Sequence, residues 1–311
     1  MPVVSIVVPI LNVEMHLSRC LESLLGQTLK EIEIILATDG GDECNAICNK
    51  YKQQDPRIKI IFQPGCYGRA VNLGIEIAEG EYIGIVEPDD WCALNMFEKL
   101  YLKAKQYDAD VVKAGYYYVE NRMLRKEIYS KNLRFLNRDT DDEFFTFPSS
   151  IWSAIYRKDF LVKNSIKFVE QKLYYVDVSF AMETFLKAEK FLYLPDGLYF
   201  YNGDNPSSSV KNKEIVNDGI LVEEFLFHRL DTKLFSRVKK QYLMGFASRV
   251  KWNLNRIADY EKKCLFWKSA SEYIRKINLS STDLIDIRNN ELKRLLICLC
   301  QNANYNNYKR K

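Results

Sequence analysis

The stretch Tyr82–Trp91, YIGIVEPDDW, joins an apolar run to a cluster of acids. Three carboxylates fall within four residues there, at Glu87, Asp89 and Asp90. Two carboxylates about 4 Å apart repel by roughly 4 kcal/mol at an effective dielectric near 20. A metal ion, a proton or splaying into water would offset that cost, and Pro and Asp are also ordinary turn residues. The acids therefore mark either a ligand site or a solvated turn, and the rest of the chain has to decide.

The first third of the chain alternates short apolar runs with helical patterns. Four runs read as strands, at residues 3–8, 32–36, 58–62 and 82–86. Helical spacing of apolar residues lies between them, at residues 17–25, 46–51 and 68–78. Continuously apolar strands that alternate with helices favour a parallel sheet covered on both faces. Ligands of such sheets bind outside the carboxyl ends of the strands, where ATDGG (37–41) and EPDDW (87–91) both lie.

The remainder is less regular. Residues 109–119 predict a strand, and an irregular charged stretch follows to about Asp142. Apolar periodicity resumes at residues 147–161, and residues 191–201 predict two short strands about a turn. From about Lys211 the pattern is helical, rich in Lys and Arg and without proline. We therefore predict two domains, residues 1–210 with the sheet and residues 211–311 as a mostly helical domain that contacts an acceptor, a membrane or another subunit.

The bulk composition is that of a globular protein, with 47% hydrophobic and 28% charged residues among 311. The net charge of +4 is too small to indicate nucleic acid, but it suits a phosphate-bearing ligand or an anionic membrane surface. The eight cysteines and two histidines show no metal or disulfide spacing, so we expect free thiols. The first residues lack the pattern of a signal peptide, and no apolar run reaches the roughly 18 residues that span a bilayer. We expect a cytoplasmic protein.

Two common phosphate-binding designs are excluded. The first predicted strand runs into PILNVE (9–14), which has no glycine, so the dinucleotide fingerprint is missing. A Walker-type loop is also missing. Phosphates must be held another way, and Mg²⁺ or Mn²⁺ on Asp89 is the natural candidate because these ions bind carboxylates together with substrate phosphates.

Four motifs together resemble family 2 glycosyltransferases in their order and spacing: VSIVVPILNVE (4–14), ATDGGDE (37–43), EYIGIVEPDDW (81–91) and YYVDVSF (174–180). The resemblance covers roughly residues 3–210. It implies the GT-A fold, a Rossmann-like and mostly parallel central sheet flanked by helices, here with a C-terminal helical appendage. It also implies inverting transfer from a nucleotide-activated sugar.

The resemblance places Pro9, Asn12 and Glu14 at the nucleotide pocket. Asp39 corresponds to the second acid of the family's usual DDGS, which meets uracil, so a UDP-sugar is the expected donor. Thr38 and Gly41 stand where the family has its first acid and its serine. An ordinary Asp-Gly turn is the structural alternative for Asp39.

The expected diphosphate contacts come from two segments. In GCYGRAVNLG (65–74), Asn72 matches the family's asparagine, and Arg69 is a candidate for the diphosphate or an ordinary surface arginine. In YFYNGDNPSSSV (199–210), Asn202 stands at the usual arginine, and three residues are candidate hydrogen-bond donors, or parts of a plain polar loop: Asn205, Ser208 and Ser209.

EPDD corresponds to the family's DxDD. The resemblance therefore implies that the nucleotide-sugar is bound by Glu87, Pro88, Asp89 and Asp90. Asp89 is the expected metal ligand, with Glu87 supporting the metal or reaching the ribose and Asp90 supporting it or facing the acceptor. The metal would neutralise charge on the leaving diphosphate.

Asp177, in VDVSF, matches the family's catalytic base, which takes the proton of the acceptor hydroxyl. A helix N-cap is the structural alternative for Asp177. Trp152 either forms the floor of the acceptor pocket or belongs to the core.

The resemblance therefore predicts a metal-dependent inverting enzyme that transfers a sugar to a glycan or lipid-linked glycan in bacterial capsule, lipooligosaccharide or polysaccharide synthesis. Nine Lys and Arg residues between 233 and 263 suit a helix lying on the inner face of an anionic membrane, or a solvated bundle. A homo-oligomer is left open. Two rival functions remain: a catalytically silent nucleotide-binding protein of this fold, and a sugar nucleotidylyltransferase, which would need a Gly-rich loop that PILNVE lacks.

Overall fold

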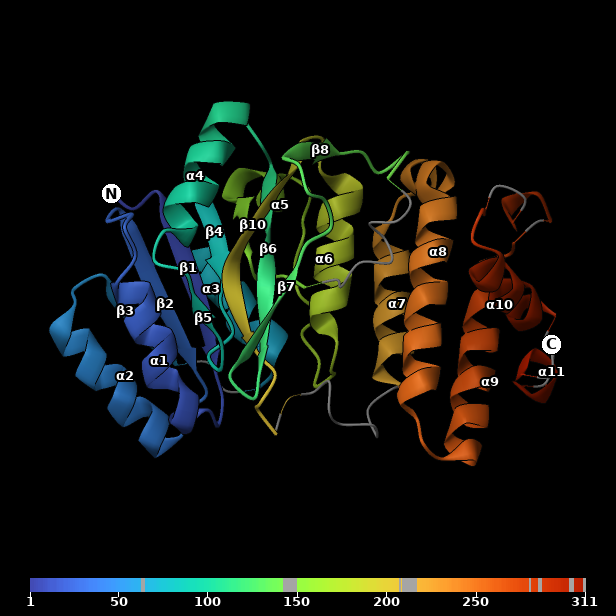
Figure 1. Ribbon diagram of the computed structural model, residues 1–311, viewed down its shortest axis with the longest axis horizontal. Coiled ribbons are helices and arrows are strands. Elements are labelled where there is room, and N and C mark those ends of the chain that lie inside the picture. Colours follow the sequence, from blue (N-terminus) through green and yellow to red (C-terminus); the bar gives the residue numbers. More distant parts are fainter. Residues whose placement is uncertain are drawn as a thin grey trace. The chain divides into compact units, whose positions relative to one another are not determined.

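The structure is a computed structural model (Figure 1), and it describes residues 1–62, 65–141, 150–206, 208, 217–279, 281–284, 287–301 and 305–309. Contacts divide the chain into two compact units. Unit 1 takes Met1–Leu136, Ser150–Lys172 and Lys187–Pro206, and unit 2 takes Asn137–Ser149, Leu173–Leu186 and Ser207–Lys311. The expected boundary at residue 210 lies outside the described residues, and the division into residues 1–210 and 211–311 stays a prediction.

Unit 1 is built on a ten-stranded sheet in the order β3-β2-β1-β4-β9-β6-β10-β5, with β7 beside β6 and β8 beside β10. The strands are β1 (Val4–Ile10), β2 (Ile32–Thr38), β3 (Ile58–Phe62), β4 (Tyr82–Ile85), β5 (Trp91–Cys92), β6 (Val111–Glu120), β7 (Met123–Glu127), β8 (Arg134–Leu136), β9 (Ala154–Arg157) and β10 (Phe191–Asn202). Its helices are α1 (Glu14–Leu25), α2 (Asp42–Gln54), α3 (Tyr67–Ile77), α4 (Met96–Tyr107) and α5 (Lys158–Lys163).

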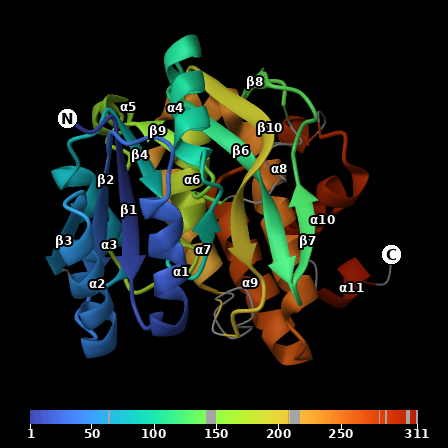
Figure 2. The same ribbon diagram turned by 60° about the vertical axis from the view of Figure 1, so that its left-hand side comes forward.

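The first four strands confirm the alternation seen in the sequence. β1 pairs in parallel with β2 and β4, and β2 pairs in parallel with β3 (Figure 2). Every residue of β1 and of β2 is buried, as expected of strands covered on both faces. β6 and β10 run in the same direction as these four because β9 pairs antiparallel with both β4 and β6. The expected α/β fold, with a mostly parallel sheet flanked by helices, is confirmed.

Two predictions for the middle of the chain were wrong. The stretch expected to be irregular contains β7, which pairs with β6, and β8, which pairs with β10. Residues 191–202 form one strand rather than two about a turn. The register against β6 shifts between Leu194 and Gly197 and again before Tyr199, so a bulge absorbs Pro195-Asp196-Gly197 without ending the strand.

Unit 2 is mostly helical over its described residues, as expected for the C-terminal appendage. Its elements are α6 (Val176–Lys187, whose last residue belongs to unit 1), α7 (Asp218–Arg229), α8 (Thr232–Arg256), α9 (Tyr260–Lys276), a 3-10 turn (Ser281–Leu284), α10 (Asn290–Cys300) and α11 (Tyr305–Lys309). Asp231, Asp259 and Asn289 cap α8, α9 and α10 by accepting from backbone N–H groups.

The interior of unit 2 buries apolar residues of α8. Leu243, Phe246 and Leu254 are buried. Lys239 and Lys251 form ion pairs with Asp283 and Glu291. This arrangement favours the solvated-bundle interpretation of the basic stretch. Within the described ranges, a helix both long and apolar enough to cross a bilayer is not found.

Candidate active site

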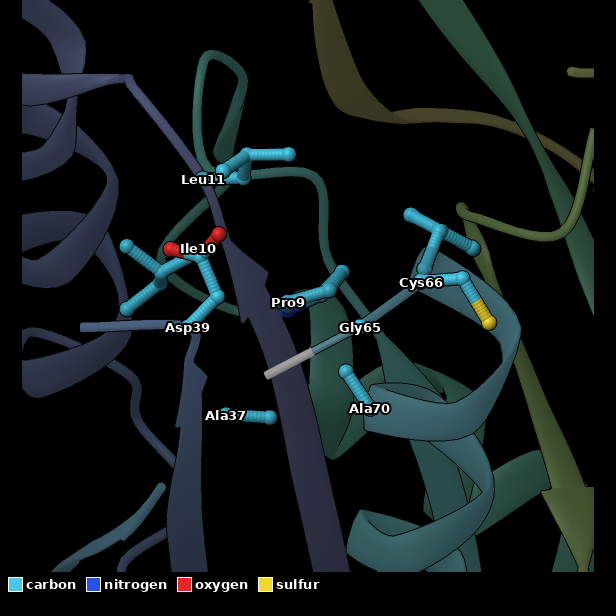
Figure 3. A pocket seen from close by; sticks show the side chains of 9 residues that line it. Pro9, Ile10, Leu11, Ala37, Asp39, Gly65, Cys66 and Ala70 are labelled. Atoms are coloured by element: carbon cyan, nitrogen blue, oxygen red, sulfur yellow. The ribbon is translucent and has the colours of Figure 1, made fainter. Parts of the chain in front are cut away.

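A pocket lies at the carboxyl ends of β1 and β2, beside the start of α3 (Figure 3). It is lined by Pro9, Ile10, Leu11, Ala37, Asp39, Gly65, Cys66, Tyr67 and Ala70. In Figure 3, Pro9 lies between Asp39 on one side and Cys66 with Ala70 on the other. The structure thus brings together Pro9 and Asp39, two of the residues that the sequence selected, at the sheet edge where ligands of such folds bind.

The end of β2 explains why Asp39 is presented to this pocket. The Asp39 N–H donates to the Ile10 carbonyl at 3.4 Å, which ties the turn to β1. Gly40 has a φ of +108° and donates its N–H to Thr38 Oγ1 at 3.2 Å. A Cβ at Gly40 would lie 2.4 Å from the Phe62 ring, so only glycine fits this turn. The turn leaves the Asp39 side chain exposed.

The acidic loop, Glu87–Asp90, follows β4, and each of its three carboxylates accepts hydrogen bonds from neutral donors. Glu87 accepts a hydrogen bond from the Tyr67 hydroxyl at 2.5 Å. Asp89 accepts one from the Asn205 side-chain amide at 2.7 Å. The acids therefore do not simply splay into water, as a solvated turn would require.

Asp90 is fully buried, with 0% exposure. The Tyr199 hydroxyl and the Asn202 N–H donate to its two oxygens, each at 2.7 Å. Burial, followed by the negative charge of Asp89, raises the pKa of Asp90 well above its usual value, and the two hydrogen bonds oppose that rise. Asp90 thus holds the acidic loop against β10 through buried hydrogen bonds.

Arg19 is a residue of this loop's surroundings that the sequence reasoning missed. From α1 its guanidinium donates to the Asp89 carbonyl at 3.0 Å and lies 3.7 Å above the centre of the Trp91 ring. Burial lowers the pKa of the Arg19 guanidinium from its usual value, and the negative charges of Asp90 and Asp89 oppose that fall. No local motif signals this contact, because seventy residues separate Arg19 from Asp89.

The other nucleotide-site candidates lie nearby on the chain, with different contacts. Asn12 adopts a left-handed φ of 50° and is exposed. Glu14 opens α1 and accepts a hydrogen bond from the Cys44 thiol at 3.3 Å. Pro88 is buried between its acidic neighbours. None of the three lines the pocket described above.

The candidates on α3 differ from each other. Arg69 is exposed in the first turn of the helix. The Asn72 amide nitrogen donates to the Phe168 carbonyl at 3.0 Å and to Glu170 at 2.9 Å, and its oxygen accepts from the Phe168 N–H at 2.9 Å. Asn72 therefore holds residues 168–170 against α3, and its role in donor binding stays a prediction.

Trp152 is a core residue in unit 1, with 9% exposure. Its ring stacks on Tyr199 at 4.6 Å and meets the edge of Tyr116 at 4.7 Å. The core alternative is thereby favoured over a floor for the acceptor. Ser208 is half-buried, and Ser209 lies outside the described residues.

Asp177 lies in unit 2, half-buried in the first turn of α6. Burial raises its pKa from 3.8 to about 6, and hydrogen bonds with the backbone N–H groups of Asp177 and Val178 oppose that rise. Tyr175, two residues before Asp177, has a left-handed φ of 64°, and its hydroxyl accepts from Arg256 at 2.8 Å. A carboxylate with this pKa suits a general base near neutral pH, and its contacts with the helix N-terminus also match the capping alternative.

The donor set for a cation is small. Among the residues that the structure describes, three or more His, Cys, Asp or Glu side chains do not gather in a metal-binding group. Asp89 is half-buried, and its role as a metal ligand stays a prediction.

The sheet, with a pocket at the carboxyl ends of its first strands, defines an α/β protein with a candidate ligand site at strand ends. The family described as "Glycosyl transferase family 2" matches residues 5–161, about half of the chain, and the chain belongs to this family. The resemblance seen in the sequence is thus confirmed.

Two curated relatives and one solved structure are similar to this chain. "Uncharacterized glycosyltransferase EpsJ" of Bacillus subtilis is 36% identical over 222 residues, 67% of this chain and 62% of that protein. "Glycosyltransferase GlyG" of Streptococcus pneumoniae is 34% identical over 214 residues, 64% of this chain and 70% of that protein. The chain thus spans less than two thirds of the first of these relatives. S. aureus TarS 1-349, solved in complex with UDP-GlcNAc, has a TM-score of 0.81 and 18% identity, covers 99% of this chain and 90% of that one, and supports the fold.

Proposed function

We propose that this protein is a metal-dependent inverting glycosyltransferase that moves a sugar from a UDP-sugar to a hydroxyl of a glycan or lipid-linked glycan. The observation that carries the proposal is the pocket of unit 1, which Asp39 lines and which the Tyr67 side chain joins to the acidic loop. Membership of the family and the UDP-GlcNAc complex of TarS support a nucleotide-sugar donor.

The pocket suits a pyrimidine nucleotide on chemical grounds. An exposed carboxylate at Asp39 accepts the N–H of uracil, and a base that lacks this N–H leaves the carboxylate without its partner. Pro9 and the aromatic ring of Tyr67 supply apolar walls. Asn12 and Glu14 border the nucleotide, and Arg69, Asn205, Ser208 and Ser209 provide donors for the diphosphate.

The residues at the loop fit a divalent cation of the kind that binds few protein ligands. Mg²⁺ and Mn²⁺ are often held by one or two carboxylates together with substrate phosphates, and Asp89 provides such a ligand, with Glu87 either supporting the ion or reaching the ribose. When bound, the ion supplies Lewis-acid neutralisation of the diphosphate. Asp90 and Asn205 position the loop, Asp90 by its buried contacts and Asn205 by its bond with Asp89.

We assign the proton transfer to Asp177. Its carboxylate accepts the proton of the acceptor hydroxyl while that oxygen attacks the anomeric carbon. The bond between that carbon and the diphosphate oxygen breaks, and its electron pair leaves with the nucleoside diphosphate. A pKa of about 6 keeps the carboxylate ionised at neutral pH and still basic enough to take part.

The acceptor is assigned by class. Among the relatives, a "Minor teichoic acid biosynthesis protein GgaB" of Bacillus subtilis is 29% identical over 174 residues, which supports a surface polymer as the acceptor. A place at the inner face of the bacterial membrane suits such a substrate, with unit 2 contacting the acceptor, the membrane or another subunit. The second candidate function, a silent nucleotide-binding protein, is favoured by Val176 and Asn202, which replace a polar residue and an arginine of the family's pattern.

Calorimetric titration with UDP, GDP, CDP and ADP, each with and without Mn²⁺, tests the proposal. We expect UDP to bind most tightly and to lose affinity when the metal is chelated. Asp39→Asn should weaken UDP selectively, whereas Asp42→Asn, an exposed acid in the first turn of α2, serves as a matched control. Tighter binding of another base would overturn the role of Asp39. Failure of all four to bind would overturn the donor class.

A further inference from the structure

Tyr67 occupies a position that none of the motifs assigns. It begins α3, its ring lines the pocket that contains Asp39, and its hydroxyl donates to Glu87 Oε1 at 2.5 Å. One side chain therefore connects the wall of the proposed base pocket with the first acid of the loop.

The orientation of Tyr67 is fixed by close packing of α3 against residues 168–170. A Cβ at Gly68 would lie 2.1 Å from the Val169 carbonyl oxygen, so the first turn of α3 lies close to that backbone and a larger residue would force one of them to shift. Asn72 ties the same segment to the helix by three hydrogen bonds. The Phe168 ring meets Tyr67 edge-on at 5.9 Å. The phenol is therefore held in place before any ligand arrives.

Glu87 benefits from such a fixed partner because its side chain is longer than that of an aspartate. A flexible carboxylate loses rotamer entropy when a ligand orders it, and a hydrogen bond formed beforehand reduces that cost. A carboxylate offers about four acceptor sites on its two oxygens, so a bond from Tyr67 to Oε1 leaves capacity for ligand hydroxyls.

We propose that Tyr67 is a positioning residue that sets Glu87 to accept from the ribose hydroxyls of the donor, and that this pair makes the site selective for a ribonucleotide. The inference rests on the proposed function. In this proposal the base faces Asp39, and the ribose attached to it lies beside Tyr67, which lines the same pocket and donates to Glu87.

The test uses Tyr67→Phe, which keeps the ring, its contact with Phe168 and the pocket wall, and removes only the hydroxyl. Calorimetry with UDP, 2′-deoxy-UDP and 3′-deoxy-UDP gives a selectivity ratio for each variant. In the wild type we expect at least one deoxy nucleotide to bind about 10-fold or more weakly, as for the loss of one hydrogen bond to a charged group. In Tyr67→Phe we expect that ratio to fall towards 1.

Tyr51→Phe is the matched control, because the Tyr51 hydroxyl donates to a glutamate, Glu22, at 3.0 Å between α2 and α1. It should leave the ratio unchanged. Glu87→Gln should lower the ratio by itself, and adding Tyr67→Phe to it should change the ratio no further. Thermal unfolding of each variant identifies any that fails to fold, in which case the Glu87→Gln ratio decides.

An unchanged ratio in Tyr67→Phe, with UDP still bound, would overturn the inference and leave the proposed function standing. Equal weakening of UDP and of both deoxy nucleotides, removed by chelating Mn²⁺, would also overturn it and would make Glu87 a metal ligand instead. Wild-type protein that binds no nucleoside diphosphate would overturn the proposed function itself.

Discussion

Replacing Asp177 with Asn should sharply lower turnover and at the same time stabilise the folded protein at neutral pH. Burial raises the native pKa of Asp177 from 3.8 to about 6, so the ionised side chain is unfavourable in the folded state. That difference corresponds to ~3 kcal/mol at pH 8, where the carboxylate is ionised in both the folded and the unfolded chain. Asn is uncharged, keeps the shape and can still cap the helix, so it removes this cost.

The sign of the effect depends on pH. A group whose folded pKa is raised contributes stability that is fully present below its unfolded pKa, about 4, and is lost as the pH rises through its folded pKa, about 6. The advantage of Asp177→Asn should therefore be near zero at pH 4 and reach its full size by pH 7 to 8. Urea unfolding at several pH values measures it. For the wild type, kcat/KM should fall below about pH 6 as the base is protonated.

Asp231→Asn is the control, since Asp231 caps α8 in the same unit from an exposed position. Its stability should change little and without this pH dependence. Turnover of a UDP-sugar by Asp177→Asn should drop by about 10² to 10⁴-fold. If the variant lost stability equally at every pH and kept its activity, Asp177 would be a helix cap and the assignment of the base would be refuted.

Three further changes test the loop and its support. Asp89→Asn should weaken Mn²⁺-dependent UDP binding by about 10-fold or more while leaving metal-free binding nearly unchanged, as measured by calorimetry; equal losses with and without metal would contradict a metal role. Arg19→Gln should raise the KM of the nucleotide-sugar more than it lowers kcat, because the Asp89 carbonyl loses its hydrogen bond from Arg19. Arg19→Lys should restore only part of the affinity, because lysine lacks the planar group that covers Trp91. Identical behaviour of the two variants would contradict a role for stacking on Trp91. Gly68→Ala should destabilise unit 1 by about 1–3 kcal/mol, because the new methyl meets the Val169 carbonyl, whereas Gly41→Ala, with open space around its Cβ, should be nearly neutral in thermal unfolding.

The four N-terminal strands were predictable because each is a continuous apolar run with a clear end. The predicted limits of β3, residues 58–62, match the structure, and those of β1, β2 and β4 differ by a few residues. The turn-like Pro195-Asp196-Gly197 misled the prediction for β10, since a bulge can absorb residues that more often end a strand. Such an outcome depends on the neighbouring strand, which a local pattern does not contain.

The acids of the loop were predictable as candidates, but their partners were not. Tyr67 and Glu87 are twenty residues apart, and Tyr199 and Asp90 are 109 apart. These pairs meet only because α3 and β10 reach the same edge of the sheet as β4. A motif identifies the residue types that a site needs. The register of the sheet decides which other side chains form hydrogen bonds with those residues.

Those partners determine how the loop should bind a cation. The phenol of Tyr67 occupies one oxygen of Glu87, and Asp90 is buried with a raised pKa, so Asp89 is the main charge that the loop offers. One carboxylate in partial contact with water binds Mn²⁺ weakly, and a nucleoside diphosphate supplies the missing oxygen ligands. We therefore expect Mn²⁺ alone to bind weakly and to bind more tightly with UDP, by the same factor by which it tightens UDP. Titrating Mn²⁺ with and without saturating UDP measures that factor, and tight binding of the metal alone would show that other residues complete its site.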